Sequence, residues 1–188
     1  MDKLYAMSVL YKGPNDSTVL KAAFELQSFS FFQRSSAQEF MCFATKTIVE
    51  RTASGARQSI KQKEYFCHVY VRSDNLAGVL ISHDEYPHLV AHILLTKTLD
   101  EFSAKFLSYS WSSLNETQVT FNELNTMLAK YQNPKEAYSL MKRQQNLKIT
   151  LHNRIEAVLK PGENLDDLVA KSEELSMPSK ALYIAKLL

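Results

Sequence analysis

The sequence has few of the residues on which most catalytic and metal-binding motifs depend. Its 188 residues include four glycines, two cysteines and one tryptophan. Four glycines leave no phosphate-cradling loop, and no GxGxxG, Walker A or GxSxG motif occurs. Cys42 and Cys67 have no metal-like spacing and follow no signal peptide, which predicts reduced thiols in a cytosolic protein. We therefore expect no enzyme, cofactor, metal site or small-molecule substrate.

Strong net charge and long apolar segments are also missing. The formal net charge is +2, and no cluster of lysines and arginines suits a phosphate-binding surface, so we expect no nucleic-acid partner. The longest apolar runs are too short to span a bilayer, so membrane association would come from a lipid, a partner or an amphipathic surface. Apolar residues make up 45% of the chain, which suits one globular domain with an appendage.

Strand and helix patterns alternate through the first 131 residues in the order β-β-α-β-β-β-α-α. Runs rich in β-branched and aromatic residues, separated by polar turns, predict five strands. Ser36 with Glu39, and Thr120 with Glu123, have the spacing of capping boxes, and Pro87 suits the first position of a helix. The predicted ranges are strands at 3–11, 18–26, 57–62, 65–72 and 76–82, and helices that begin near 36, 87 and 120.

The first predicted helix carries an apolar face. Phe40, Phe43, Ala44, Thr47 and Ile48 recur on it at helical spacing. The aromatic stretch that includes two of these residues could stack on bases, but it lacks surrounding positive charge; its members are Phe29, Phe31, Phe32, Phe40 and Phe43. It is therefore more typical of a core or of a protein-binding groove.

Three histidines lie close together in the sequence. His83, His88 and His92 resemble a metal cluster, because the last two share one face of the predicted helix. The pattern lacks the glutamate next to the first helical histidine that hydrolytic zinc helices use. Histidines at such a strand-to-helix corner are more typical of solvated polar residues, so a histidine-based metalloenzyme is the least favoured alternative.

The composition changes after Gln132. Asn133 and Pro134 predict the start of a helix. From residue 135 onward there is one glycine and no phenylalanine or tryptophan, but leucine, lysine, glutamate and glutamine are abundant, which indicates a helical rod. We therefore divide the chain into a globular domain, residues 1–131, and a helical segment, residues 134–188.

Apolar residues of the helical segment recur in steps of three and four, which is the spacing of a coiled-coil seam. Pro161 interrupts it, since a proline inside a helix costs about 3 kcal/mol, and Pro178 is expected to end or kink a later helix. Short helices of this kind gain stability by folding back on a domain. The seam residues are Leu147, Leu151, Val158, Leu165, Leu168, Leu175 and Leu182.

Five stretches carry a family resemblance. They are FSFFQRSSAQEF at 29–40, QKEYFCHVYVRSDNLAGVLI at 62–81, DEYP at 84–87, KYQNPKEA at 130–137 and NLDDLVAKSEELSMPSKALY at 164–183. In them the chain resembles the longin-domain R-SNAREs of the lipid-anchored Ykt type. The resemblance implies an α+β fold: a profilin-like longin domain, with a five-stranded antiparallel sheet flanked by helices, and then a SNARE-like helical segment.

The resemblance also implies a function. SNARE segments of this family join three other SNARE helices in a parallel four-helix bundle that mediates membrane fusion, here on ER–Golgi, endosomal or vacuolar routes. The partners would be Q-type SNARE helices or the chain's own longin groove, for which Phe40, Phe43 and Ile48 are the candidate residues. The protein would be cytoplasmic and associated with Golgi, endosomal or other secretory-pathway membranes.

The sequence departs from the family pattern at three places. Pro161 stands where the family has the central arginine that binds three glutamines of the bundle. Residues 146–148 replace a segment about three residues longer, which shifts the heptad phase. The family ends in two cysteines within a prenylation motif, whereas this sequence ends in Ile184 to Leu188, so we expect no lipid anchor and only indirect membrane contact.

These departures leave two alternatives to a fusing R-SNARE. One is a divergent relative that keeps the fold but acts as a soluble regulator, because it lacks the central arginine and the anchor. The other is a longin-type adaptor that holds a partner with its sheet and first helix. Formation of an SDS-resistant bundle would favour the fusing R-SNARE over both.

Overall fold

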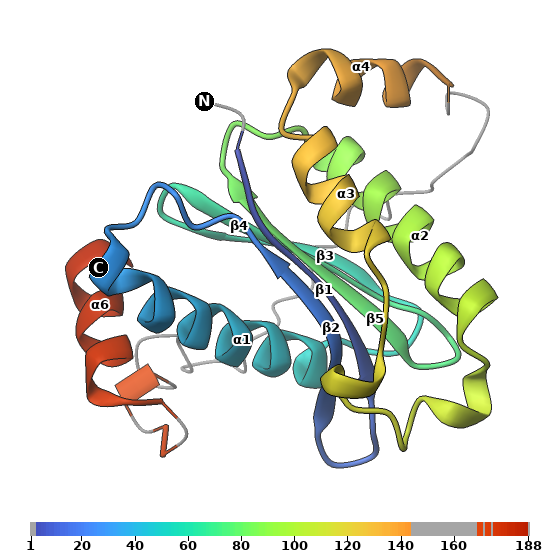
Figure 1. Ribbon diagram of the computed structural model, residues 1–188, viewed down its shortest axis with the longest axis horizontal. Coiled ribbons are helices and arrows are strands. Elements are labelled where there is room, and N and C mark those ends of the chain that lie inside the picture. Colours follow the sequence, from blue (N-terminus) through green and yellow to red (C-terminus); the bar gives the residue numbers. More distant parts are fainter. Residues whose placement is uncertain (1–2, 144–168, 171, 174, 188) are drawn as a thin grey trace.

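The computed structural model describes residues 3–143, 169–170, 172–173 and 175–187 (Figure 1). Its centre is a five-stranded antiparallel sheet in the order β2-β1-β5-β4-β3, which confirms the predicted α+β fold. No helix within these described ranges is long and apolar enough to cross a membrane. The strands are β1 (Leu4–Lys12), β2 (Ser17–Phe24), β3 (Arg57–Gln62), β4 (Tyr65–Val71) and β5 (Leu76–His83), close to the predicted ranges.

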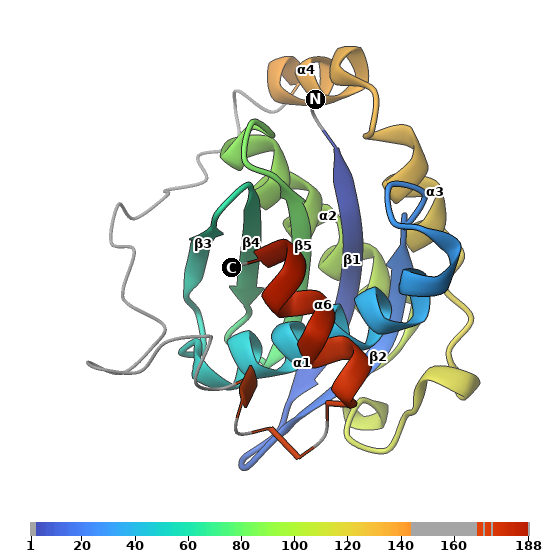
Figure 2. The same ribbon diagram turned by 90° about the vertical axis from the view of Figure 1, so that its left-hand side faces the viewer.

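The two central strands are buried because helices cover both faces of the sheet. Residues 4–10 of β1 and 76–82 of β5 are all buried. Helix α1 (Arg34–Arg51) covers one face, whereas α2 (His88–Lys105) and α3 (Glu123–Lys130) cover the other (Figures 1 and 2). Two apolar cores result, one on each side of the sheet.

Gly78 allows α2 to lie close to β5. A Cβ atom at this position would stand 3.1 Å from Leu95 Cδ2 and 3.3 Å from Leu99 Cδ2. Both distances are shorter than the optimal separation of carbon atoms. A larger residue at position 78 would therefore have to push the helix away from the sheet.

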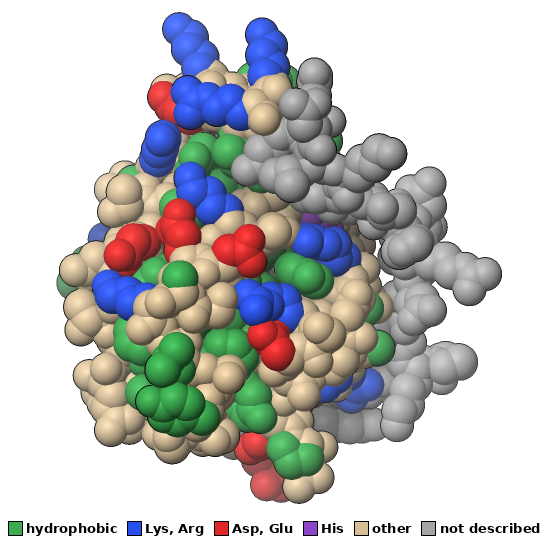
Figure 3. All heavy atoms as spheres, turned by 90° about the vertical axis from the view of Figure 1, so that its right-hand side faces the viewer, with side chains coloured by type: hydrophobic (Ala, Val, Ile, Leu, Met, Phe, Trp, Pro, Cys, Tyr) green, Lys and Arg blue, Asp and Glu red, His purple; other side chains and the backbone are tan. Residues whose placement is uncertain are grey.

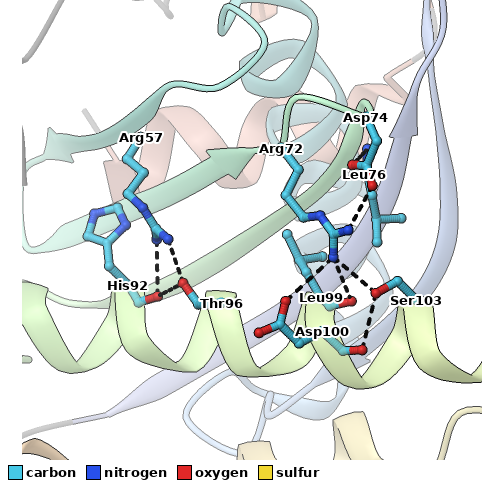
Figure 4. A network of polar contacts seen from close by, with 9 residues as sticks. All are labelled: Arg57, Arg72, Asp74, Leu76, His92, Thr96, Leu99, Asp100 and Ser103. Carbon is cyan, nitrogen blue, oxygen red and sulfur yellow. Dashed lines mark hydrogen bonds and ion pairs between the residues drawn. The ribbon is translucent and has the colours of Figure 1, made fainter. Parts of the chain in front are cut away.

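Two arginines join the sheet to α2 through hydrogen bonds (Figure 4). Arg57 donates to the His92 carbonyl at 3.2 Å and to Thr96 Oγ1 at 2.5 Å. Arg72 donates to the Leu99 carbonyl at 3.2 Å. Because the contacts fall two helical turns apart, they fix the direction of α2 as well as its position.

The start of α1 differs from the prediction, because the capping box of Ser36 and Glu39 does not form. The helix begins at Arg34, directly after the 3-10 turn η1 (Phe31–Gln33), and no side-chain hydrogen bond caps it. Glu39 turns instead toward the C-terminal segment. Pro87 is likewise the residue before α2 rather than its first residue.

The start of α3 was also placed too early. The helix begins at Glu123, and the predicted capping box with Thr120 is absent. Asn115 and Gln118 form a capping box instead, at the 3-10 turn η3 (Glu116–Gln118). The turn η2 (Ser108–Ser110) precedes it. The loop after α2 therefore contains two short turns of 3-10 helix.

Helix α4 (Pro134–Arg143) begins where the sequence predicted. Asn133 Oδ1 accepts a hydrogen bond of 3.0 Å from the Lys135 N–H, as a capping residue does. Ala137 and Leu140 are buried in the same core as α2 and α3. The first helix of the predicted helical segment therefore packs on the globular domain. The boundary that we place between the two parts of the chain, at residues 131–134, stays a prediction.

Candidate functional site

The described part of the C-terminal segment, residues 169–170, 172–173 and 175–187, lies against α1. Helix α6 (Met177–Leu187) packs on α1, and both lie on the same face of the sheet (Figures 1 and 2). Five residues of α1 contact this segment or pack beside the contact. We call them the docking face of α1: Ser36, Glu39, Phe40, Phe43 and Ala44.

The centre of the contact is apolar. Phe40 and Ala44 form a buried cluster with Val169 and Leu175, and the half-buried Phe43 packs against it. Phe40 is 9% exposed, Val169 2% and Leu175 6%. Removing such side chains from water favours association of the segment with the helix.

Polar contacts surround this cluster. The Ser176 N–H donates to Glu39 Oε1 at 2.6 Å, and Ser176 Oγ donates to Glu39 Oε2 at 3.0 Å. Ser179 Oγ donates to the Ser36 carbonyl at 3.2 Å. The bond from the Ser176 N–H lowers the pKa of Glu39 below its ordinary value, so the contact favours the ionised carboxylate.

Ser176 also caps α6. Its Oγ accepts from the Ser179 N–H at 3.4 Å, and its carbonyl accepts from the Lys180 N–H at 3.1 Å. The Glu39 carboxylate thus lies at the positive end of the α6 dipole. Pro178 stands in the first turn of α6, where a proline is tolerated, and the earlier helix that it was expected to end or kink falls largely outside the described residues.

The predicted groove residues fall into two places. Phe40 and Phe43 meet the C-terminal segment directly. Ile48 belongs to the core between α1 and the sheet, and the seam residue Leu182 of α6 joins the same core. Leu147, Leu151, Val158, Pro161, Leu165 and Leu168 of the predicted seam lie outside the described residues.

The sequence reading missed the polar half of the site. Glu39 was assigned to a helix cap, and Ser176 had no role. No local signal connects these two residues, since their contact depends on how the whole chain folds. The apolar half was easier to find, because helical periodicity alone selects Phe40 and Phe43.

A second polar cluster lies between the sheet and α2, on the opposite face. Ser59 Oγ is 2.7 Å from His68 Nδ1 and 2.9 Å from His92 Nε2. His68 Nε2 is 3.2 Å from Ser82 Oγ. Burial lowers the pKa of His92 to about 4, and the nearby positive charge of Arg57 adds to this shift.

This cluster corrects the histidine prediction. His92 is 2% exposed rather than solvated, and Ser59 bridges it to His68 of β4, which the sequence grouping did not include. His83 lies apart, with its Nδ1 atom 3.2 Å from Asp84 Oδ1. In the part of the chain that the structure describes, no group of three or more histidine, cysteine or carboxylate side chains has a metal-binding arrangement.

Comparison with known proteins agrees with this architecture. Residues 26–128 match the family model Longin, described as a regulated-SNARE-like domain. The synaptobrevin homolog ykt6 of Schizosaccharomyces pombe is 50% identical over 184 residues, 96% of this chain and 93% of that protein. The synaptobrevin homolog YKT6 of Saccharomyces cerevisiae is 42% identical over 186 residues, with the same coverage of both chains. The chain belongs to the longin-domain R-SNARE family.

Longin-domain R-SNAREs of this type are non-enzymatic proteins of vesicular transport, as the sequence predicted. The five-stranded sheet with α1 on one face and α2 and α3 on the other is therefore the longin domain of this R-SNARE. Helix α6 lies beyond the residues matched by the longin model, within the segment that the family resemblance assigns to the SNARE motif.

Proposed function

We propose that this longin-domain R-SNARE takes part in membrane fusion by joining Q-type SNARE helices, and that its longin domain regulates the step by holding the C-terminal segment on α1. The proposal rests chiefly on one observation: Leu175 is buried against Phe40 and Ala44 on the docking face of α1. Leu175 is also a predicted seam residue. One side chain cannot pack on α1 and on a partner helix at the same time.

The segment is regulated because its contact with α1 and its contact with partner helices exclude each other. Leu182, a second predicted seam residue, is 9% exposed in the core on the α1 side of the sheet. Partner helices that bind the seam therefore bind only the released form of the segment. The fraction of molecules in the released form then limits the apparent affinity for partners.

The mechanism assigns roles to the site residues, and the family resemblance supports a location. Phe40, Phe43 and Ile48 act as the longin groove. Residues 134–188 act as the SNARE segment, whose part beyond α4 leaves the groove while α4 stays packed beside α2. The protein works from the cytoplasmic side on Golgi, endosomal or other secretory-pathway membranes, where fusion requires SNARE bundles. No nucleic acid or small-molecule substrate enters this mechanism.

The test uses Phe43→Glu, with Phe32→Glu as the matched control because Phe32 is 91% exposed. A carboxylate placed against the buried cluster costs free energy, so Phe43→Glu should release the segment. Amide exchange of residues 175–187 should rise in Phe43→Glu and stay unchanged in Phe32→Glu. Assembly into an SDS-resistant bundle with Q-type helices should become faster in Phe43→Glu alone. Equal exchange in both variants would refute the regulation by α1.

A second candidate function follows from Pro161. This residue stands at the central position of the seam, where the family has an arginine, and it cannot donate to three glutamines. The protein would then bind SNARE or other trafficking partners through the longin domain and regulate them without driving fusion. Binding to partners without an SDS-resistant bundle, in the parent and in Phe43→Glu alike, would favour this function or that of an adaptor.

A further inference from the structure

Helix α4 has two sides of different character. Ala137 is 2% exposed and Leu140 7%, and both pack into the core beside α2. Residues three and seven positions apart share one side of a helix. The exposed side opposite the core carries four side chains, and we call it the basic face of α4: Lys135, Tyr138, Lys142 and Arg143.

The residues before α4 hold this face in a fixed orientation. The Leu4 N–H donates to Gln132 Oε1 at 2.9 Å, and Gln132 Nε2 donates to the Leu4 carbonyl at 2.6 Å. Tyr86 Oη donates to the Tyr131 carbonyl at 3.0 Å. The basic face therefore belongs to the folded longin domain and keeps its direction when the C-terminal segment moves.

Positive charge is concentrated on this helix. Its ten residues contain three basic side chains and one acidic side chain, a net charge of +2, which equals the formal net charge of all 188 residues. The single acid, Glu136, has its carboxylate 4.0 Å from Lys130 Nζ, so it is partly neutralised by α3. Figure 3 shows lysine and arginine side chains gathered over α4, projecting from one end of the molecule.

An aromatic ring lies within the charged surface. Tyr138 is 56% exposed and shares the exposed side of the helix with Lys135 and Lys142. Helices that lie on membranes combine basic side chains, which attract anionic headgroups, with aromatic rings that settle at the headgroup level. A projecting helix can reach a flat surface without any rearrangement of the domain around it (Figures 1 and 3).

We propose that the basic face of α4 binds the surface of membranes that contain anionic phospholipids. This contact adds a lipid surface to the protein contacts proposed above and does not depend on them. In this orientation α1 and α6, on the other face of the sheet, stay clear of the bilayer. The C-terminal segment on the docking face of α1 then remains accessible to partner helices while the longin domain is held at the membrane.

The experiment measures binding of the full chain to vesicles by flotation. One set contains phosphatidylcholine only, and in the other phosphatidylserine replaces part of it, at low and at high salt. The parent protein should bind the anionic vesicles at low salt and leave them at high salt, because exposed charges are screened. Removing two basic residues with Lys142→Gln and Arg143→Gln should lower binding by roughly tenfold or more, since each basic residue near an anionic surface contributes about a factor of five.

Two matched controls separate the helix face from general effects. Lys46→Gln with Lys105→Gln removes the same charge from α1 and from the far end of α2, and it should leave binding within about twofold. Tyr138→Ala should weaken binding severalfold, whereas Tyr109→Ala, at a tyrosine that is 81% exposed in η2, should not. Thermal unfolding of each variant confirms that the fold is retained.

Three outcomes would overturn the proposal. The first is absence of binding to anionic vesicles, including the case in which the protein binds an acidic peptide instead. The second is equal binding to neutral and anionic vesicles. The third is equal loss of binding in the two double variants, which would assign the effect to net charge alone.

Discussion

Glu39 on α1 accepts a hydrogen bond of 2.6 Å from the N–H of Ser176, a residue 137 positions further along the chain. The same serine caps α6, so one residue both starts the helix and attaches it to the longin domain. The acceptor is a carboxylate, and charged acceptors make stronger hydrogen bonds than neutral ones. Glu39 therefore accepts two of the polar contacts described above, and the bond from Ser179 to the Ser36 carbonyl is the other.

Replacing Glu39 with alanine should loosen the C-terminal segment without unfolding the domain. The variant loses both bonds to Ser176, and because the site is partly exposed we expect an effect of about 1 kcal/mol, close to fivefold in the opening equilibrium. Amide exchange of residues 175–187 measures it. Glu64→Ala, at an exposed residue of the turn between β3 and β4, is the control. Identical exchange in both variants would contradict the assigned role of Glu39.

The buried histidines should make the domain less stable in acid. The pKa of His92 falls from 6.5 to about 4 on folding, chiefly because the ring is buried. Between these values the unfolded chain binds more protons than the folded chain, so stability decreases as the pH falls below 6.5, and this contribution levels off below about 4. The shift corresponds to about 3 kcal/mol.

Urea unfolding at pH 7 and at pH 4 measures this dependence. His92→Gln keeps a polar group near Ser59 but cannot take up a proton, so the pH dependence of its unfolding free energy should be smaller by about 3 kcal/mol. His83→Gln, at a histidine outside the cluster, should behave as the parent protein does. A steep acid dependence that persists in His92→Gln would show that other groups cause it.

Substitutions at Pro161 should distinguish helix continuity from the central contact. Pro161→Ala and Pro161→Arg both remove a helix-breaking residue, which is expected to favour a continuous helix by about 3 kcal/mol. Only the arginine can bind the three glutamines of the partner helices. We expect both variants to gain helicity with Q-type helices, and Pro161→Arg alone to form an SDS-resistant bundle. If both variants formed the SDS-resistant bundle equally well, or neither formed it, the contact of an arginine with the three glutamines would not be what the protein lacks.

Gly78→Ala should destabilise the domain by about 1–3 kcal/mol, because the added methyl group meets Leu95 and Leu99. Thermal or urea unfolding measures the loss. Leu99→Val makes room beside position 78, so the double variant should lose less than the sum of the two single losses. Additive losses would indicate that the methyl group finds space elsewhere.

The strands were predictable from sequence because their signals are local. Polar turns separate short runs rich in β-branched and aromatic residues, and runs of this length and composition are typical of strands. Helix starts were less predictable. The spacing of Ser36 and Glu39 fits a capping box, yet the 3-10 turn before α1 starts the helix earlier. Glu39 is consequently left for a distant partner that sequence spacing cannot identify.

The histidine cluster is a second set of contacts that sequence spacing cannot identify. His88 and His92 attract attention because they are close in sequence, but the hydrogen-bond partner of His92 is Ser59 of β3, which also contacts His68 of β4. Ser59 of β3 connects His92 to His68 because β3 and β4 are adjacent in the sheet. Such a set of side chains is assembled by topology. Only the strand order, and not any motif, brings it together.

Helix α6 has 11 residues, fewer than an isolated helix needs to be stable in water, roughly 12–15. Leaving α1 removes both the apolar contacts of Leu182 and the bonds that its capping residue Ser176 makes to Glu39. Undocking and unwinding are therefore one event. The segment departs as an extended tether whose reach exceeds that of a rigid helix, so it can capture a partner at a greater distance and regain its helical form during zippering.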